Sequence, residues 1–182
     1  MTMRDDAIFL HQFIDSYPDW PVKGTTFRDL TRLYQSASAL HRVVSTLKGR
    51  YIDADLSHIA AIEARGFIVG GMLAASLNLP LVLIRKGDKL AGKPLQQQVE
   101  MAYGTRQMQL RRDACQPGDR VVIFDDLVAT GGSIIGASTL LKELGAEIHE
   151  VATVAEIPDE GCRDMIGSAD ISLFSLVAFE NR

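Results

Sequence analysis

Residues 121–133 restrict the fold of this 182-residue chain more than any other stretch. They read Val-Val-Ile-Phe-Asp-Asp-Leu-Val-Ala-Thr-Gly-Gly-Ser, which is an apolar run, two carboxylates and a loop of small residues. The run 121–124 follows the turn signal Pro117-Gly118-Asp119, which favours a short buried parallel strand. Apolar residues recur at helical spacing over 134–144, before Gly145. The stretch therefore predicts a strand, an acidic pair at its tip, a tight loop and a helix.

The predicted loop has the character of an anion site. It consists of small residues, whose glycines allow a ligand to approach the backbone closely: Ala129, Thr130, Gly131, Gly132 and Ser133. Backbone amides at a helix N-terminus attract anions, although small residues at such a turn often serve tight packing alone. Asp125 and Asp126 would repel an isolated phosphate. A sugar with a phosphate at one end and a diol at the other satisfies both features.

Composition limits the class of protein. With 47% hydrophobic residues, the chain can form one compact domain over 1–182. A net charge of −4 without a basic cluster argues against nucleic-acid binding. No signal peptide and no run of about 18 apolar residues is found, so we expect no membrane contact and a soluble, cytoplasmic protein.

The cysteines and histidines suggest no metal centre. Cys115 and Cys162 are far apart, so neither a zinc site nor a disulfide framework is indicated. The histidines are scattered without ligand spacing and are interpreted as structural: His11, His41, His58 and His149. Common nucleotide-loop, hydrolase-elbow and metalloprotease motifs are also absent.

The rest of the chain predicts alternating strands and helices. Asp5 or Asp6 can cap a first helix, and Ser36 a second helix that ends near Gly49. Residues 17–34 are rich in aromatics without a clear period and are interpreted as a lid or hood. Further strands are expected at 58–62, 81–84, 148–155 and 171–178, and a mobile loop at 85–98. This alternation implies a parallel sheet covered by helices on both faces.

A second strand–loop–helix unit places a cation opposite the anion loop. Glu63-Ala64-Arg65-Gly66-Phe67 follows the strand predicted at 58–62, and loops at the carboxyl ends of neighbouring parallel strands share one crevice. Arg65 could form a surface salt bridge, but beside Gly66 we favour pyrophosphate binding. Lys86, Lys89 and Lys93 could be a solvated face, and we expect only Lys86 to clamp a pyrophosphate. Phe27, otherwise a packing residue, could stack on a purine beside Arg28.

Residues 121–133 resemble the signature of the type I phosphoribosyltransferases, with Ser133 where Thr is frequent. Residues 17–30 look like the hood of the adenine phosphoribosyltransferases, and 63–67 like their pyrophosphate loop. Leu83-Ile84-Arg85-Lys86 with the later Tyr103-Gly104 looks like their flexible loop. The resemblance covers nearly the whole chain. It implies a type I phosphoribosyltransferase fold, α/β with a parallel sheet flanked by helices, a hood at about 1–34 and a flexible loop at about 85–104.

The resemblance also implies a reaction, in which adenine and 5-phosphoribosyl 1-pyrophosphate give AMP and pyrophosphate. Mg²⁺ is implied mainly through the pyrophosphate substrate, without a protein metal cluster, and so is a homodimer. The catalytic residues would be Asp125, Asp126 and Arg65. Substrate would be bound by Phe27, Arg28, Gly66, Lys86 and the loop Ala129, Thr130, Gly131, Gly132 and Ser133.

One departure from the family pattern bears on the chemistry. Ala102 stands where the family usually has a loop glutamate, and Glu100, two residues upstream, is a possible substitute. Two alternatives therefore stay open: a phosphoribosyltransferase for hypoxanthine, guanine or xanthine, and a non-catalytic regulator that binds phosphoribosyl pyrophosphate.

Overall fold

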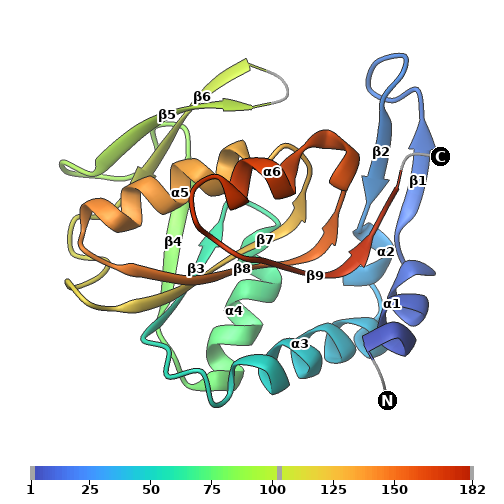
Figure 1. The fold of residues 1–182 in the computed structure, drawn as a ribbon, viewed down its shortest axis with the longest axis horizontal. Helices are drawn as coiled ribbons and strands as arrows, with labels where there is room; N and C mark the ends of the chain where they lie inside the picture. Colours follow the sequence, from blue (N-terminus) through green and yellow to red (C-terminus); the bar gives the residue numbers. More distant parts are fainter. Residues whose placement is uncertain (1–2, 102–103, 181–182) are drawn as a thin grey trace.

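A computed structural model describes residues 3–101 and 104–180 (Figure 1). The helices are α1 Met3–His11, α2 Thr31–Tyr34, α3 Ala37–Tyr51, α4 Gly66–Leu77, α5 Gly132–Glu143 and α6 Cys162–Gly167, with a 3₁₀ turn η1 at Pro158–Glu160. The strands are β1 Asp15–Pro18, β2 Thr26–Asp29, β3 His58–Ile62, β4 Leu81–Lys86, β5 Leu95–Met101, β6 Gly104–Leu110, β7 Arg120–Val128, β8 Glu147–Glu156 and β9 Leu173–Ala178.

The central sheet has seven strands in the order β5-β6-β4-β3-β7-β8-β9. Five strands are parallel to one another, namely β4, β3, β7, β8 and β9. The other two, β5 and β6, form an antiparallel hairpin at one edge. The predicted α/β fold with a largely parallel sheet is confirmed. The carboxyl ends of β3 and β7, which pair directly, therefore meet at one edge of the sheet.

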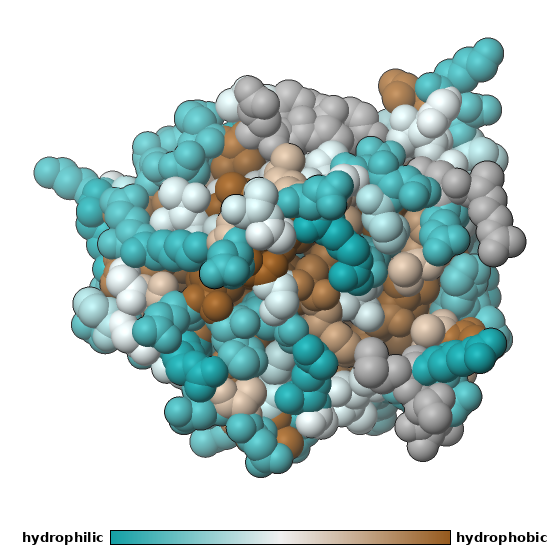
Figure 2. Space-filling model, viewed as in Figure 1, coloured by the Kyte–Doolittle hydropathy of each residue, from teal (hydrophilic) through white to brown (hydrophobic). Residues whose placement is uncertain are grey.

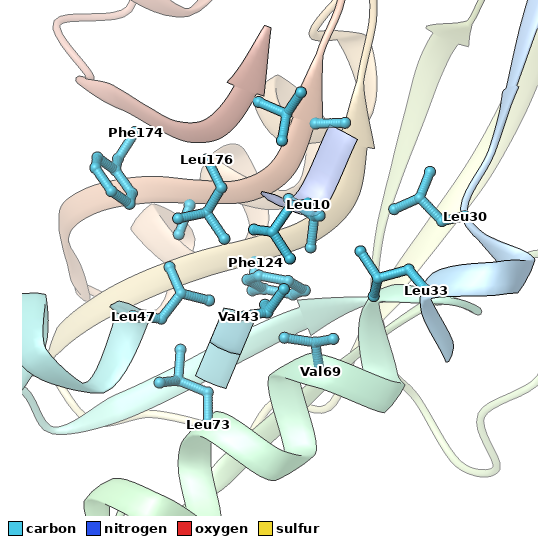
Figure 3. Close-up of a cluster of buried hydrophobic side chains, with 14 of the residues drawn as sticks. Leu10, Leu30, Leu33, Val43, Leu47, Val69, Leu73, Phe124, Phe174 and Leu176 are labelled. Atoms are coloured by element: carbon cyan, nitrogen blue, oxygen red, sulfur yellow. The ribbon is translucent and has the colours of Figure 1, made fainter. Parts of the chain in front are cut away.

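Helices cover both faces of the sheet, as the alternation of strands and helices predicted. Along β7, Val122 and Phe124 pack with α3 and α4, whereas Val121 and Ile123 pack with α5 and α6. Figure 1 shows α3 and α4 below the sheet and α5 and α6 above it. The first of these cores surrounds Phe124 with leucines and valines from several elements (Figure 3). Both faces of β7 are thus buried, which fixes the residues that follow Phe124.

The central strand is longer than the sequence indicated. A strand was expected at 121–124, but β7 continues to Val128 and contains both aspartates of the acidic pair. The cause lies in its neighbour β8, where Thr153 pairs with Asp125 and Ala155 with Leu127. Backbone pairing holds this segment extended regardless of its polar side chains. The acidic pair is therefore built into the sheet instead of standing at its tip.

The N-terminal segment is more regular than predicted. Within 17–34, which showed no clear period, the structure has the β1–β2 hairpin and the short helix α2. Asp6 does not cap the first helix but lies within it and accepts hydrogen bonds from Arg42 and Thr46 of α3. The predicted cap at Ser36 is confirmed, because its hydroxyl accepts the Ala39 N–H.

The run expected to be a mobile loop at 85–98 is partly strand. β4 extends to Lys86, and β5 begins at Leu95 and pairs along β6. Between these strands, the Gln109 side-chain oxygen accepts the backbone N–H groups of Lys89 and Leu90. Ala102 and Tyr103 lie outside the described residues. Across the described ranges, none of the helices has the length and apolar character needed to cross a membrane.

Candidate active site

A cleft of about 380 Å³ opens at the carboxyl ends of β3 and β7. The structure brings together here most of the side chains that the sequence singled out: Arg65, Lys86, Asp125, Asp126, Ala129, Thr130, Gly131, Gly132 and Ser133. Gly66 lies directly behind the acidic pair, since a Cβ there would be 3.2 Å from both Asp125 Oδ1 and the Phe124 carbonyl oxygen. Glycine thus permits α4 to begin against β7.

The acidic pair forms the buried floor of this cleft. Asp125 is 7% exposed and Asp126 only 3%. The Asp126 carboxylate accepts a hydrogen bond from the Tyr34 hydroxyl at 3.0 Å and pairs with Arg65 Nε at 2.8 Å. Asp125 Oδ1 accepts the backbone N–H of Asp126 at 3.0 Å. Arg65 is thus the ionic partner of Asp126, whereas both Lys86 and Arg65 act electrostatically on Asp125.

Burial controls the protonation of this pair. Removal from water raises the pKa of Asp125 to about 7, and the neighbouring charge of Asp126 adds to the rise. Burial also raises the pKa of Asp126, against the opposing effects of Arg65 and the Tyr34 hydrogen bond. Near neutral pH the acidic pair of the free protein therefore tends to retain a proton. A cationic ligand would favour the ionised form.

The loop 129–133 leads into α5, as predicted. Gly131 has φ of +88° and is the residue before the helix. A Cβ at Gly131 would meet Ile166 at 3.3 Å and the Cys162 carbonyl oxygen at 3.4 Å, both in α6. The glycine is therefore required by its backbone conformation and by packing on α6, in addition to any approach of a ligand. The loop and the first residues of α5 line the cleft, and the amides of a helix N-terminus favour an anion.

Glu63 has a role that the sequence did not reveal. Its carboxylate accepts hydrogen bonds from Lys89 Nζ at 2.6 Å, Arg85 Nε at 3.1 Å and the Lys86 backbone N–H at 2.8 Å. Burial alone would raise the pKa of Glu63, but these donors outweigh it and lower the pKa to about 2. Glu63 thus fixes the end of β4 and so positions Lys86 at the cleft.

Tyr34 was also missed. It comes from α2, which follows the β1–β2 hairpin, and its hydroxyl reaches Asp126, 92 positions later in the sequence. Burial and the Asp126 charge raise the pKa of Tyr34, so it stays a hydrogen-bond donor. No local pattern could identify it, because a tyrosine in a short amphipathic turn usually serves packing.

Phe27 and Arg28 are not among the residues that line this cleft. The Phe27 ring packs edge-on against Trp20, with 4.5 Å between centroids. The Arg28 guanidinium lies over the Phe179 ring at 4.6 Å and donates to the Ser16 hydroxyl. Their predicted contact with a purine therefore stays a prediction.

The sheet and this cleft define a phosphoribosyltransferase, and a family model described as "Phosphoribosyl transferase domain" matches residues 32–179. The chain is 39% identical over 178 residues to the adenine phosphoribosyltransferase of Marinomonas sp. (strain MWYL1), covering 98% of this chain and 99% of the relative. It is 42% identical over 176 residues to that of Paraburkholderia xenovorans (strain LB400), covering 97% of this chain and 94% of the relative. The chain belongs to the adenine phosphoribosyltransferase family.

Solved structures agree with this assignment. The structure of the Giardia lamblia enzyme complexed with 9-deazaadenine superposes with a TM-score of 0.90 at 30% identity, covering 100% of this chain and 99% of that one. The adenine phosphoribosyltransferase of Rhodothermus marinus gives a TM-score of 0.88 at 31% identity, with 97% and 99% covered.

Proposed function

We propose that adenine and 5-phosphoribosyl 1-pyrophosphate react in this cleft to form AMP and pyrophosphate. As a family member the chain is a pentosyltransferase of purine salvage. The observation that carries the site assignment is the acidic pair, buried between a loop at a helix N-terminus and a loop bearing Arg65. Relatives named for adenine favour this base over the 6-oxopurines.

Each end of the sugar phosphate has a complementary partner in this proposal. The amides of 129–133 would bind the 5-phosphate, because the helix dipole and the free N–H groups favour an anion there. Asp125 and Asp126 would accept hydrogen bonds from the ribose 2- and 3-hydroxyls. Lys86 and Arg65 lie on the remaining wall and would bind the pyrophosphate.

Substrate binding requires Arg65 to change partner. In the free protein this guanidinium is paired with Asp126, although 43% of its side chain is exposed to solvent. A pyrophosphate offers paired oxygens that suit the planar guanidinium better than one carboxylate oxygen does. Once Arg65 turns to pyrophosphate, the Asp126 oxygen is released for ribose. Tyr34 keeps Asp126 oriented during this exchange.

The acidic pair then acts on the transition state. Breaking the bond from C1 to pyrophosphate develops positive charge on the ribose ring, and a nearby carboxylate stabilises that charge more than it stabilises the ground state. The raised pKa of Asp125 means that a cationic ring draws this side chain into its ionised form. Preorganised groups of this kind typically lower the barrier by about 2.7 to 4 kcal/mol.

Mg²⁺ belongs to the proposal as an ion carried mainly by the substrate. The cleft offers carboxylate oxygens, the ligand type that Mg²⁺ prefers, but the Asp126 carboxylate already interacts with Arg65 and Tyr34. This donor set fits an ion held largely by pyrophosphate oxygens, ribose hydroxyls and water. When bound, the ion would neutralise part of the pyrophosphate charge.

The hood would recognise the base, with Phe27 and Arg28 as the residues predicted to do so. The proposed hood at about 1–34 includes the β1–β2 hairpin, and the proposed flexible loop at about 85–104 includes the Lys86 end of β4. Glu100 lies in β5, where its backbone pairs with Thr105. The rate of adenine turnover depends on which group takes over the role of the family's loop glutamate, because this chain has Ala102 at that position.

A homodimer and a cytoplasmic location complete the proposal. Support for a dimer comes from large apolar side chains that the described residues leave about half exposed, including Ile8, Trp20 and Val22. Figure 2 also shows an apolar band across the middle of an otherwise largely hydrophilic face. Sedimentation equilibrium of the full chain tests this assembly, and a single monomeric species would contradict it.

The test of function is product formation by the purified full chain. With labelled adenine, 5-phosphoribosyl 1-pyrophosphate and Mg²⁺, AMP and pyrophosphate should form in equal amounts. Asp126→Asn should reduce the rate by roughly 10²- to 10³-fold, whereas Asp53→Asn, at an exposed aspartate on another surface, should not. Turnover of hypoxanthine or guanine instead of adenine would favour the rival enzyme. Binding without any turnover would favour the regulator.

A further inference from the structure

A second cluster of polar side chains lies at the amino ends of β3 and β7, opposite the ends that open into the cleft. One ring nitrogen of His58, the Cys115 sulfur and one carboxylate oxygen of Asp119 all lie within 4.8 Å of one another. His58 begins β3, and Asp119 directly precedes β7, its parallel neighbour. Asp119 is seven residues from Asp126, or about 23 Å along an extended strand. The cluster is therefore separate from the substrate cleft.

The distance between His58 and Asp119 suits two metal ligands better than a direct hydrogen bond. His58 Nδ1 is 3.5 Å from Asp119 Oδ2 and is a buried atom without a hydrogen-bond partner. A nitrogen and an oxygen ligand, each about 2.05 Å from one tetrahedral zinc ion, would be about 3.4 Å apart. An ion between the two atoms would satisfy both, whereas a direct hydrogen bond at this distance would be weak.

The turn that carries two of these ligands is held in place. Asp119 Oδ2 accepts the Gln116 backbone N–H at 2.7 Å, and the Asp119 N–H donates to the Gln116 carbonyl at 3.1 Å. Gly118 N–H donates to the carbonyl of Gly145 at 2.9 Å, which anchors the turn to the end of α5. Such outer contacts orient a ligating carboxylate. The Asp119 carboxylate and its turn are thus held in place before any ion binds.

The surrounding charges leave room for a cation. The adjacent Arg120 directs its guanidinium away from the cluster, toward the Asp55 carbonyl at 3.2 Å and His149 Nδ1 at 3.0 Å. Cys115 is buried, whereas the side chains of His58 and Asp119 are 17% and 21% exposed. Solvent can therefore supply a fourth ligand. Imidazole and thiolate ligands favour zinc over Mg²⁺ or Ca²⁺, which prefer oxygen alone.

We propose that His58, Cys115 and Asp119 bind one zinc ion, with water as the fourth ligand. The ion would join the start of β3 to the turn before β7 and so stabilise the fold without entering the reaction. No sequence pattern indicates this site, because the ligands come from positions 58, 115 and 119 and only the pairing of β3 with β7 brings them together.

Cobalt provides the direct test, since a thiolate bound to Co²⁺ gives a charge-transfer absorption band that oxygen and nitrogen ligands do not. Metal-free full-length protein should show this band on titration with Co²⁺, and Zn²⁺ should remove it by displacement. Cys115→Ser should abolish the band. Cys162→Ser, at the other buried cysteine, should retain it. The cleft cannot produce this signal, because no cysteine is among its described lining residues.

Two further variants keep the test independent of one cysteine. His58→Gln and Asp119→Asn should each weaken Zn²⁺ binding by at least about 100-fold, since even outer-shell partners contribute 10- to 100-fold. Asn at position 119 keeps an oxygen for the Gln116 N–H. Zn²⁺ should raise the melting temperature of the wild type and of Cys162→Ser, but not that of the ligand variants. Absence of the band in the wild type, or a band that survives Cys115→Ser, would overturn the proposal.

Discussion

Replacing Asp125 by asparagine should make the protein more stable at neutral pH and much less active. Asn keeps an oxygen that can accept the Asp126 N–H, but it carries no charge. The wild-type carboxyl is buried and has a pKa of about 7, against 3.8 for an ordinary aspartate. Its ionisation therefore opposes folding. In the proposed reaction this charge stabilises the transition state, so stability and turnover should move in opposite directions.

The sign and size of the stability effect follow from the two pKa values. Below pH 4 the carboxyl is protonated in both the folded and the unfolded chain. Between pH 4 and 7 the unfolded chain has released a proton that the folded chain keeps, so the free energy of unfolding falls as the pH rises. One pKa unit corresponds to about 1.36 kcal/mol. The free energy of unfolding of Asp125→Asn should therefore gain about 2 to 3 kcal/mol relative to the wild type between pH 5 and pH 8.

Thermal unfolding measures this difference. For a chain of this size the growth corresponds to roughly 5 to 10 °C in the gap between the two melting temperatures. Asp53→Asn, at an exposed position, serves as the control and should show no such growth. Turnover of Asp125→Asn should fall by roughly 10²- to 10³-fold. A constant gap between pH 5 and pH 8, or a variant that loses stability and activity together, would refute the reasoning.

Other substitutions test single contacts. Tyr34→Phe removes the donor to Asp126 and should lower kcat by roughly 10-fold without weakening AMP binding, and an unchanged kcat measured in steady state would count against a positioning role. Lys86→Ala should raise the KM for phosphoribosyl pyrophosphate far more than that for adenine, and an unchanged KM for phosphoribosyl pyrophosphate would show that the loop takes no part. Gly131→Val should abolish AMP binding in calorimetry, because valine tolerates neither the positive φ nor the contact with Ile166, and retained affinity would be inconsistent with this. Glu100→Gln should lower adenine turnover if Glu100 takes over the role of the missing loop glutamate. An unchanged rate of AMP formation would exclude that role for Glu100.

The sequence predicted the parts of the cleft that follow local rules. The loop 129–133 was identifiable because Gly131 and Gly132 stand between an apolar run and a segment with helical periodicity. Arg65 was identifiable because it follows the strand predicted at 58–62, which was expected to share a crevice with the strand at 121–124. The length of β7 was not predictable, since pairing with β8 keeps Asp125 and Asp126 extended against their polar character.

Long-range contacts explain what sequence analysis missed. Tyr34 reaches Asp126 and Glu63 reaches Lys89 only after the sheet has formed, and no local pattern indicates either contact. The strands of the hood, each four residues long, carry no buried alternation that would distinguish them from an irregular lid. Position 102, where the family pattern is broken, lies outside the described residues.

The most direct test of the account is the rate of AMP formation from adenine by the wild type and by Ala102→Glu, beside the rates with hypoxanthine and guanine. We expect slow but real turnover of adenine by the wild type, because the sequence retains the segments proposed as the hood and as the two phosphate loops. Ala102→Glu should accelerate it, since a well-placed general acid or base contributes roughly 10² to 10⁴ in rate. No adenine turnover by either protein, together with turnover of a 6-oxopurine, would contradict the account.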